Sequence, residues 1–211
     1  MIKKFLSVLT LTLCFVLVAK AQEDNSRKNK VIVYAGPQLS TANCGGGVAL
    51  SGKFSYLAGV QYEHDLSDMW GFYAGAEYTS KGINGLEFMD GHEDDYTLNY
   101  VQCNLGVKFE KEIFGIDGLA EVGPYVAYGI GGNSTQGSTG YEGNSFGEFG
   151  ENFGFKKFDA GINVGVGADF GGLRIMVGYQ HGLMNIADED LISNGYKNYG
   201  FYAKIGYGFK F

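Results

Sequence analysis

Apolar and polar side chains alternate most clearly at the C-terminal end of the chain, which reads Tyr199-Gly-Phe-Tyr-Ala-Lys-Ile-Gly-Tyr-Gly-Phe-Lys-Phe211. Every second residue, counted from Tyr199, is aromatic or aliphatic, and the residues between them are glycine, tyrosine or lysine. Successive side chains of a β-strand point to opposite faces. The pattern therefore predicts a strand with one apolar and one polar face.

The same alternation recurs along the chain and indicates further strands. The candidates are residues 31–39, 54–64, 70–79, 97–109, 119–130, 158–170, 173–183 and 199–211. In each, one parity carries no Asp, Glu, Lys or Arg, and the other carries the charges, the amides and most of the glycines. A soluble barrel would need a densely charged exterior, whereas a glycine-rich face suits a small, crowded interior. We therefore expect the uncharged face to contact lipid.

Aromatic residues gather near the ends of this apolar face, which is typical of the girdles of membrane barrels. They are Tyr62, Trp70, Phe72, Tyr78, Phe109, Tyr128, Phe158, Phe170, Tyr199, Phe209 and Phe211.

The connections between the candidate strands alternate in length. The short ones are 65–69, 110–118 and 171–172, and the longer ones are 40–53, 80–96, 131–157 and 184–198. Short periplasmic turns and long external loops are typical of outer-membrane barrels. An open sheet edge in lipid would leave backbone groups unpaired, so the last strand should pair with the first. We predict an all-β fold, an eight-stranded antiparallel up-and-down transmembrane β-barrel in the cell outer membrane.

Composition agrees with this class. The 211 residues include 35 glycines and 2 prolines, and 15% of them are aromatic. Such a chain is too aromatic to be disordered and too poor in proline to resemble collagen. After the first twenty residues, no apolar run approaches the roughly 18 residues of a membrane helix.

Residues 1–21 are predicted to be a cleaved signal peptide, because Lys3 and Lys4 precede an apolar run that ends at a cleavage-like Ala-Lys-Ala. A retained helical anchor is the alternative, but the run is shorter than the roughly 20 residues that span a bilayer. Residues 22–30 would form a polar periplasmic lead, and residues 31–211 the outer-membrane barrel domain.

Removal of this segment would lower the net charge from −7 to −10, because it holds three lysines and no acid. An acidic chain offers no basic surface for phosphates, so nucleic acid is not expected as a partner. Cys44 and Cys103 would remain on non-adjacent strands at different heights, which predicts two free thiols. Whether either is modified is left open.

Three stretches resemble the small outer-membrane β-barrel proteins ("porin family", PorT-like) of Bacteroidota. They are Phe158-Asp-Ala-Gly-Ile-Asn-Val-Gly-Val-Gly-Ala-Asp-Phe170, Leu173-Arg-Ile-Met-Val-Gly-Tyr-Gln-His-Gly-Leu-Met-Asn185 and the C-terminal stretch. The resemblance implies a barrel in the outer membrane but no single activity, because that family is functionally diverse. The ending with Tyr207, Phe209 and Phe211 resembles the C-terminal assembly signal of such proteins. It implies the barrel-assembly machinery as a transient partner during biogenesis.

Charged residues on the polar parity are predicted to face the lumen. They are Glu63, Glu77, Lys108, Glu121, Asp169, Arg174, Lys204 and Lys210. The turn at 171–172 would pair Asp169 with Arg174, and Lys108 should approach Glu121 across the turn at 110–118. An unpaired buried charge costs several kcal/mol, and an eight-stranded barrel is just wide enough for side chains to fill. We predict a lumen closed by this network; an open pore with incidental ion pairs is the alternative.

No motif indicates a cofactor or catalysis. Gly165-Val-Gly167 and Gly129-Ile-Gly-Gly132 resemble phosphate-binding loops, but no helical pattern follows either one. We interpret them as strand glycines that make room for lumen side chains. A lipid-modifying enzyme would need a nucleophile beside a base, and none of the three histidines belongs to a His-x-Ser pair. His92, next to three acidic residues, lies either in a solvated acidic loop or at a cation site.

These patterns favour an interaction barrel that anchors in outer-membrane lipid and presents external loops, with 80–96 and 131–157 as candidate ligand surfaces. Loop 131–157 is either a mobile loop or an adaptable binding surface. Its aromatic residues would supply contact area: Tyr141, Phe146, Phe149, Phe153 and Phe155. The alternative is porin-like transport of small or hydrophobic solutes, with Pro37 and Pro124 as weak points of the wall. A lipid-modifying enzyme is the least favoured function.

Overall fold

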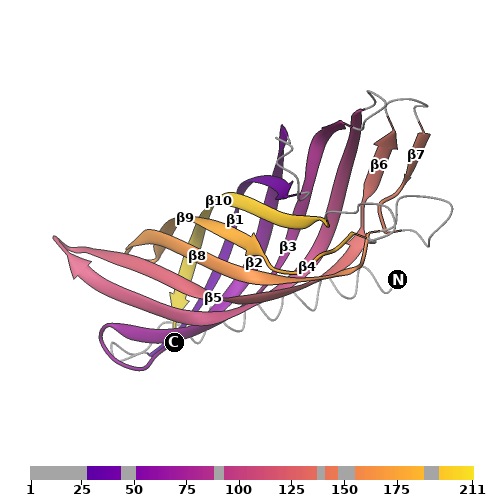
Figure 1. Cartoon of the computed structure of the whole chain (residues 1–211). Helices are drawn as coiled ribbons and strands as arrows, with labels where there is room; N and C mark the ends of the chain where they lie inside the picture. Colours follow the sequence, from indigo (N-terminus) through magenta and orange to yellow (C-terminus); the bar gives the residue numbers. More distant parts are fainter. Residues whose placement is uncertain (1–27, 44–50, 88–92, 137–140, 147–154, 188–194) are drawn as a thin grey trace, which may run out of the picture.

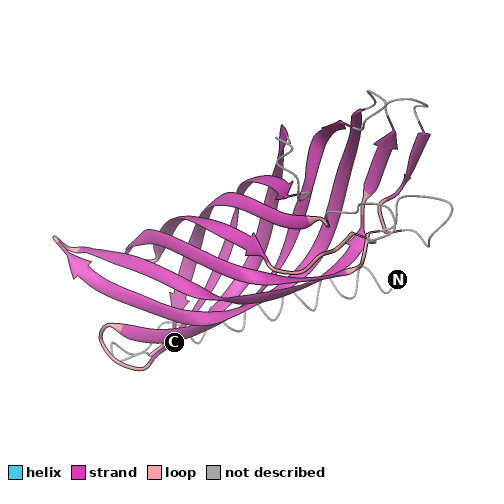
Figure 2. Cartoon of the chain, in the orientation of Figure 1, coloured by secondary structure: helices cyan, strands magenta, loops and turns pink. Residues whose placement is uncertain are grey.

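The structure, a computed structural model, describes residues 28–43, 51–87, 93–136, 141–146, 155–187 and 195–211. The segments predicted to be a signal peptide and most of a polar lead lie outside these ranges. The described residues contain ten β-strands and no helix (Figure 2). None of them belongs to a helix that could cross a membrane.

Eight strands form a closed antiparallel barrel, as predicted. They are β1 (Asn29–Asn43), β2 (Ser51–Asp65), β3 (Trp70–Glu87), β4 (Glu93–Ile113), β5 (Ile116–Gly131), β8 (Phe158–Phe170), β9 (Leu173–Gly182) and β10 (Lys197–Lys210). The ring closes because β1 pairs with both β2 and β10, while β3 pairs with β4 (Figure 1). Each backbone edge in the membrane thereby finds a partner. With an even strand number, both ends of the barrel domain lie on the periplasmic side.

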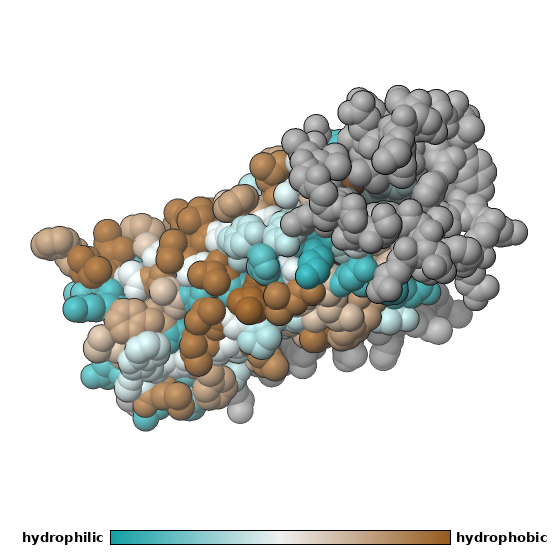
Figure 3. Space-filling model, in the orientation of Figure 1, coloured by the Kyte–Doolittle hydropathy of each residue, from teal (hydrophilic) through white to brown (hydrophobic). Residues whose placement is uncertain are grey.

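The apolar parity faces outward, as the sequence predicts. Val164, Ile175 and Ile205 are 47%, 45% and 55% exposed, and hydrophobic side chains, in brown, cover much of the outer surface visible in Figure 3. Glu121 and Arg174, on the other parity, are buried in the lumen. The hydropathy of each face is therefore the reverse of that in a soluble barrel, because lipid is the solvent outside.

Aromatic side chains contact one another at both ends of the outward face. Near the periplasmic end, the rings of Trp70 and Phe109 lie 5.0 Å apart. Toward the external end, the ring centroids of Tyr179 and Phe201 are separated by 4.9 Å. Two girdles thus border the lipid-facing band.

Several strands extend further than the sequence predicts. Most of 80–96 belongs to β3 and β4 rather than to a loop, and segment 131–157 contains the hairpin of β6 (Asn133–Gln136) and β7 (Tyr141–Asn144). β6 pairs with β4, so the sheet continues beyond the membrane band (Figure 1). The alternation of apolar and polar residues ends where the membrane ends. The strands continue beyond it, because backbone hydrogen bonds do not depend on that alternation.

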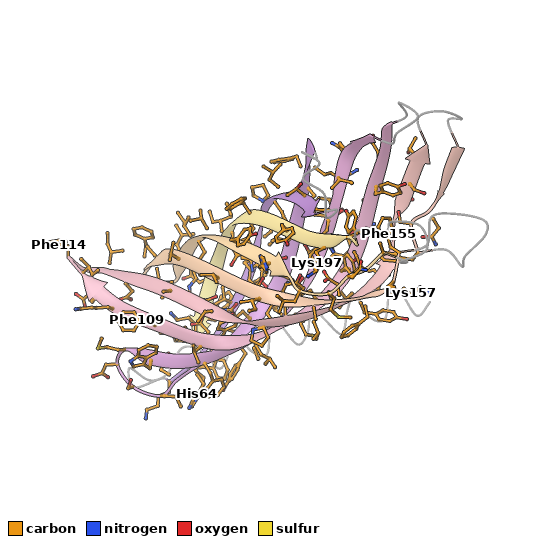
Figure 4. All side chains as sticks on the ribbon, in the orientation of Figure 1. His64, Phe109, Phe114, Phe155, Lys157 and Lys197 are labelled. Carbon is orange, nitrogen blue, oxygen red and sulfur yellow. The ribbon has the colours of Figure 1, made fainter. Side chains whose placement is uncertain are left out.

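The connection expected at 110–118 is also mostly strand. β4 and β5 pair as far as Ile113 and Ile116, and only Phe114 and Gly115 form the turn. Figure 4 places Phe114 at the tip of this periplasmic hairpin. The short turns at 66–69 and 171–172 lie where the sequence predicts them.

Candidate functional site

The lumen is filled by polar side chains arranged in layers along the barrel axis. At the periplasmic end, Glu63 of β2 is fully buried and accepts hydrogen bonds from two cations. The guanidinium of Arg174 donates to both oxygens of Glu63, with a distance of 3.1 Å from Nη2 to Oε2. Lys108 Nζ lies 2.8 Å from the same Oε2 and 2.7 Å from Oδ1 of Asp65. One carboxylate therefore joins β2 to β4 and β9.

Asp169 completes this periplasmic layer. Its Oδ2 lies 3.3 Å from Arg174 Nη2 and 3.0 Å from Lys30 Nζ. The pairing of Asp169 with Arg174, predicted from the turn at 171–172, is confirmed. Lys30 was assigned to the polar lead by its sequence context, but it belongs to β1 and is buried.

The predicted approach of Lys108 to Glu121 is only partly right. The two residues are partners in the register of β4 and β5, but Lys108 Nζ turns to Glu63, Asp65 and Glu110. Glu121 instead accepts hydrogen bonds from Gln61 Nε2 at 2.8 Å and from Arg174 Nη1 at 3.4 Å. The long lysine side chain reaches past β3 to carboxylates of β2, which the register of β4 and β5 alone does not reveal.

The middle layer is centred on Glu77 of β3. Its Oε2 accepts hydrogen bonds from Tyr34 at 2.8 Å and from Lys204 Nζ at 3.1 Å. Its Oε1 accepts one from Gln102 Nε2 at 2.8 Å. The ammonium of Lys204 also lies 4.5 Å from the ring centroids of Tyr34 and Tyr202, a cation–π arrangement.

A third layer, toward the external end, is centred on Asp159 of β8. Its Oδ2 accepts hydrogen bonds from Lys81 Nζ at 3.2 Å, Asn198 Nδ2 at 3.0 Å and Tyr125 Oη at 3.3 Å. Neither Asp159 nor Lys81 was among the predicted network residues. Asp159 lies on the predicted lumen parity and was therefore within reach of the sequence pattern, but Lys81 fell in a predicted loop.

The most deeply buried charges balance, and Lys108 also pairs with two partly exposed acids at the rim, Asp65 and Glu110. The buried or nearly buried charged residues of the described lumen comprise five acids, Glu63, Glu77, Glu121, Asp159 and Asp169, and five bases, Lys30, Lys81, Lys108, Arg174 and Lys204. Each takes part in at least one ion pair. An uncompensated charge here would carry a large desolvation penalty, so neutrality within the network stabilises the closed state.

An apolar cap lies at the external end of the lumen. Tyr96, Phe155 and Tyr196 pack edge to face, with ring centroids 5.1 and 5.0 Å apart, and Phe146 packs on Tyr100. If segment 131–157 is a binding surface, Phe146 and Phe155 do not supply its contact area, because both are buried in this cluster. The side chains of the other aromatics of 131–157 lie outside the described residues.

Lumen glycines make room for aromatic rings, as interpreted from the sequence. A Cβ on Gly165 would lie 2.8 Å from the hydroxyl of Tyr202, and one on Gly161 would lie 2.6 Å from the ring of Tyr125. The ring of Phe146 occupies the corresponding space at Gly129. These glycines are therefore packing positions rather than phosphate-binding loops.

The remaining predicted residues lie at the rims or outside the barrel. Lys210 is exposed at the periplasmic end of β10, and Tyr207 and Phe209 face outward near it with ring centroids 5.1 Å apart. His64 Nδ1 lies 2.7 Å from Oδ1 of Asn29, and His92 is not among the described residues. Recognition of the C-terminal residues by the assembly machinery stays a prediction.

The described residues show neither a metal site nor a disulfide. They contain no group of three or more His, Cys, Asp or Glu placed to hold a metal ion. Cys103 is a free, exposed thiol, in agreement with the sequence, and Cys44 lies outside the described ranges.

A family model described as "Outer membrane protein beta-barrel domain" matches residues 7–209. No curated protein matches the chain significantly. Among solved structures, similarity is found to the attachment invasion locus protein Ail of Yersinia pestis, at 13% identity over 86% of this chain and 99% of that chain, with a TM-score of 0.48. Neisserial surface protein A (11%, 87% and 97%, 0.45) and the N-terminal barrel domain of Pseudomonas aeruginosa OprF (10%, 87% and 98%, 0.42) are also similar.

Proposed function

Because the chain belongs to the family of outer membrane protein β-barrel domains, we propose that it is a sealed anchor that holds an external binding surface and conducts no solutes. The filled lumen carries this proposal. Three layers of ion pairs and hydrogen bonds lie beneath an apolar cap, and every charged residue of the layers is paired.

The external part of the sheet supports the binding role. β3, β4, β6 and β7 are neighbours in one sheet, and β6 pairs with the outer end of β4 at Asp94–Tyr96. Among the described residues of this extension, Asp95, Asn133, Thr135 and Asn144 are exposed, and all four are polar or acidic. Segments 80–96 and 131–157 thus remain the proposed ligand surfaces, and their described strands β3, β4, β6 and β7 present a pleated sheet.

Finer assignments follow from the sequence. We propose that the chain is one of the PorT-like barrels of Bacteroidota, that residues 1–21 direct its export, and that the assembly machinery inserts it. Three stretches of resemblance and the aromatic C-terminus support these assignments. Catalysis has no part in the proposal.

Planar-bilayer recording tests the sealed lumen. The wild-type protein should show no steady conductance, whereas the double variant Glu77→Gln, Lys204→Met, which removes the middle ion pair without leaving an unpaired charge, should show brief small openings. Lys111→Ala, on the exposed periplasmic hairpin, is the control and should behave as wild type. A steady, large wild-type conductance would refute the proposal and favour porin-like transport.

A further inference from the structure

An apolar groove crosses the lipid-facing wall over β2, β1, β10, β9 and β8. Its volume is about 750 Å³, and nearly all of its lining is apolar. Phe54 and Phe201, 75% and 63% exposed, protrude from one outward row of side chains. Pro37 and Ala203 are small and occupy the next row toward the periplasm, where the wall is recessed. The recess lies in the half of the band nearer the external girdle.

The backbone of the wall explains why the groove forms here. Gly165 of β8 and Gly178 of β9 are register partners on the lumen face, where Tyr202 fills the space beneath both, so the outer surface here is formed by their outward neighbours, among them Val177. In the β1–β10 ladder, no partners are recorded at Gly36 and Pro37, and proline has no N–H to donate. Small residues and a gap in the ladder therefore coincide within one patch.

The groove is closed on its inner side. Tyr202 lies behind it and packs with Ile32, Tyr34 and Leu57 in a buried cluster of the lumen. A cavity of only about 10 Å³ is found there, lined in part by Ile32 and Tyr34, and it has room for about one water. The groove therefore opens to lipid and not to a route through the wall.

Polar and basic groups border the groove on its external side. Tyr179, His181, Tyr199 and Phe201 form one aromatic cluster, in which the rings of His181 and Tyr199 lie 4.7 Å apart. Lys197 follows on the same face of β10, two residues beyond Tyr199, at the external end of the barrel (Figure 4). Both His181 and Lys197 are exposed.

We propose that this groove binds one acyl chain of an outer-leaflet lipid and that His181 and Lys197 bind the phosphate of the same molecule. The barrel face is in contact with lipid because the protein is an outer-membrane barrel. The groove volume lies within the range of about 300–1,000 Å³ of small-molecule sites. At the height of the headgroups, the exposed Lys197 provides complementary charge in an otherwise acidic chain, and the exposed His181 provides a ring nitrogen that can hydrogen-bond to the phosphate.

Native mass spectrometry of the detergent-solubilised protein, titrated with dioleoylphosphatidylglycerol, tests this site. The wild type should bind one lipid saturably. Ala203→Phe fills the groove and should weaken binding by about tenfold or more, which is a free-energy change of about 1.4 kcal/mol. Ala76→Phe places the same ring on the outward face of β3, away from the groove, and should leave binding unchanged. Heat-modifiable gel mobility shows that each variant is folded, and Ala203→Val replaces Ala203→Phe if it is not.

A second set of variants tests the contact with the lipid headgroup. His181→Gln with Lys197→Gln should weaken phosphatidylglycerol binding by about tenfold, whereas Lys111→Gln at the periplasmic end should not. Millimolar inorganic phosphate should not displace the lipid, because the acyl chain supplies most of the contact. Binding that is not saturable, or that is equal in Ala203→Phe and Ala76→Phe, would overturn the site. The site would also be overturned if the wild-type protein let apolar solutes into liposomes and Ala203→Phe blocked that uptake, because the groove would then be an entrance for solutes rather than a lipid site.

Discussion

At the scale of single residues, Phe114 is the clearest departure from local preference. It is fully exposed, and it is the non-glycine residue with positive φ, 55°, among the described residues. With Gly115 at 80° it forms a two-residue hairpin turn in which both residues have positive φ, a pattern that favours Asn-Gly. The sequence shows the glycine but gives no reason to expect an aromatic residue before it, which is why the turn was predicted to be longer.

Replacement of Phe114 by Asn should therefore stabilise the barrel. Asn adopts positive φ more readily than Phe, and relief of this strain should raise the free energy of unfolding by about 1 kcal/mol. Unfolding in guanidinium from detergent micelles measures the change. Phe114→Val is the opposite control, because a β-branched residue is poorer still at positive φ, and an equal stability of the two variants would contradict the argument.

At the scale of elements, the lipid-facing strands were predictable and the external ones were not. Inside the membrane, lipid and lumen impose a period of two, which the residues of β8, β9 and β10 show directly. Outside it, water solvates both faces, so β6 and β7 carry Asn, Ser, Thr, Gln and Gly without an apolar period. The sequence leaves open whether the aromatic residues of that segment lie on the surface, and two of them, Phe146 and Phe155, instead help form the cap of the lumen.

The cap provides a prediction at this scale. Phe155 is 6% exposed and contacts both Tyr96 and Tyr196, so Phe155→Ala should lower the free energy of unfolding by about 3–5 kcal/mol. Phe158→Ala removes a ring of the same size that is 47% exposed on the outer face, and it should lower the free energy of unfolding by clearly less. Equilibrium unfolding followed by tryptophan fluorescence of Trp70 compares the two. Similar losses would mean that the cap adds no packing beyond that of a surface ring.

At the scale of the whole molecule, the sequence predicts which face a charge lies on but not which partner it meets. Parity places Glu63, Lys108 and Arg174 in the lumen, because lipid excludes charge from the other face. The partner then depends on how far each strand is shifted against its neighbours, and on side-chain reach across a narrow interior. Lys30 and Lys81 were missed for a related reason, since both lie beyond the predicted ends of strands that in fact continue.

The neutrality of the lumen makes its residues depend on one another. Glu63→Gln would leave Arg174 and Lys108 without their shared carboxylate in a buried layer, which should lower the free energy of unfolding by about 3–5 kcal/mol. In the double variant with Arg174→Met, one cation is removed together with the acid, so the combined loss should be smaller than the sum of the two single losses by about 0.5–3 kcal/mol. A double-mutant cycle in guanidinium measures this coupling. Additive losses would show that each charge is stabilised separately, by water or by other neighbours, and that the barrel is not sealed by a single balanced network.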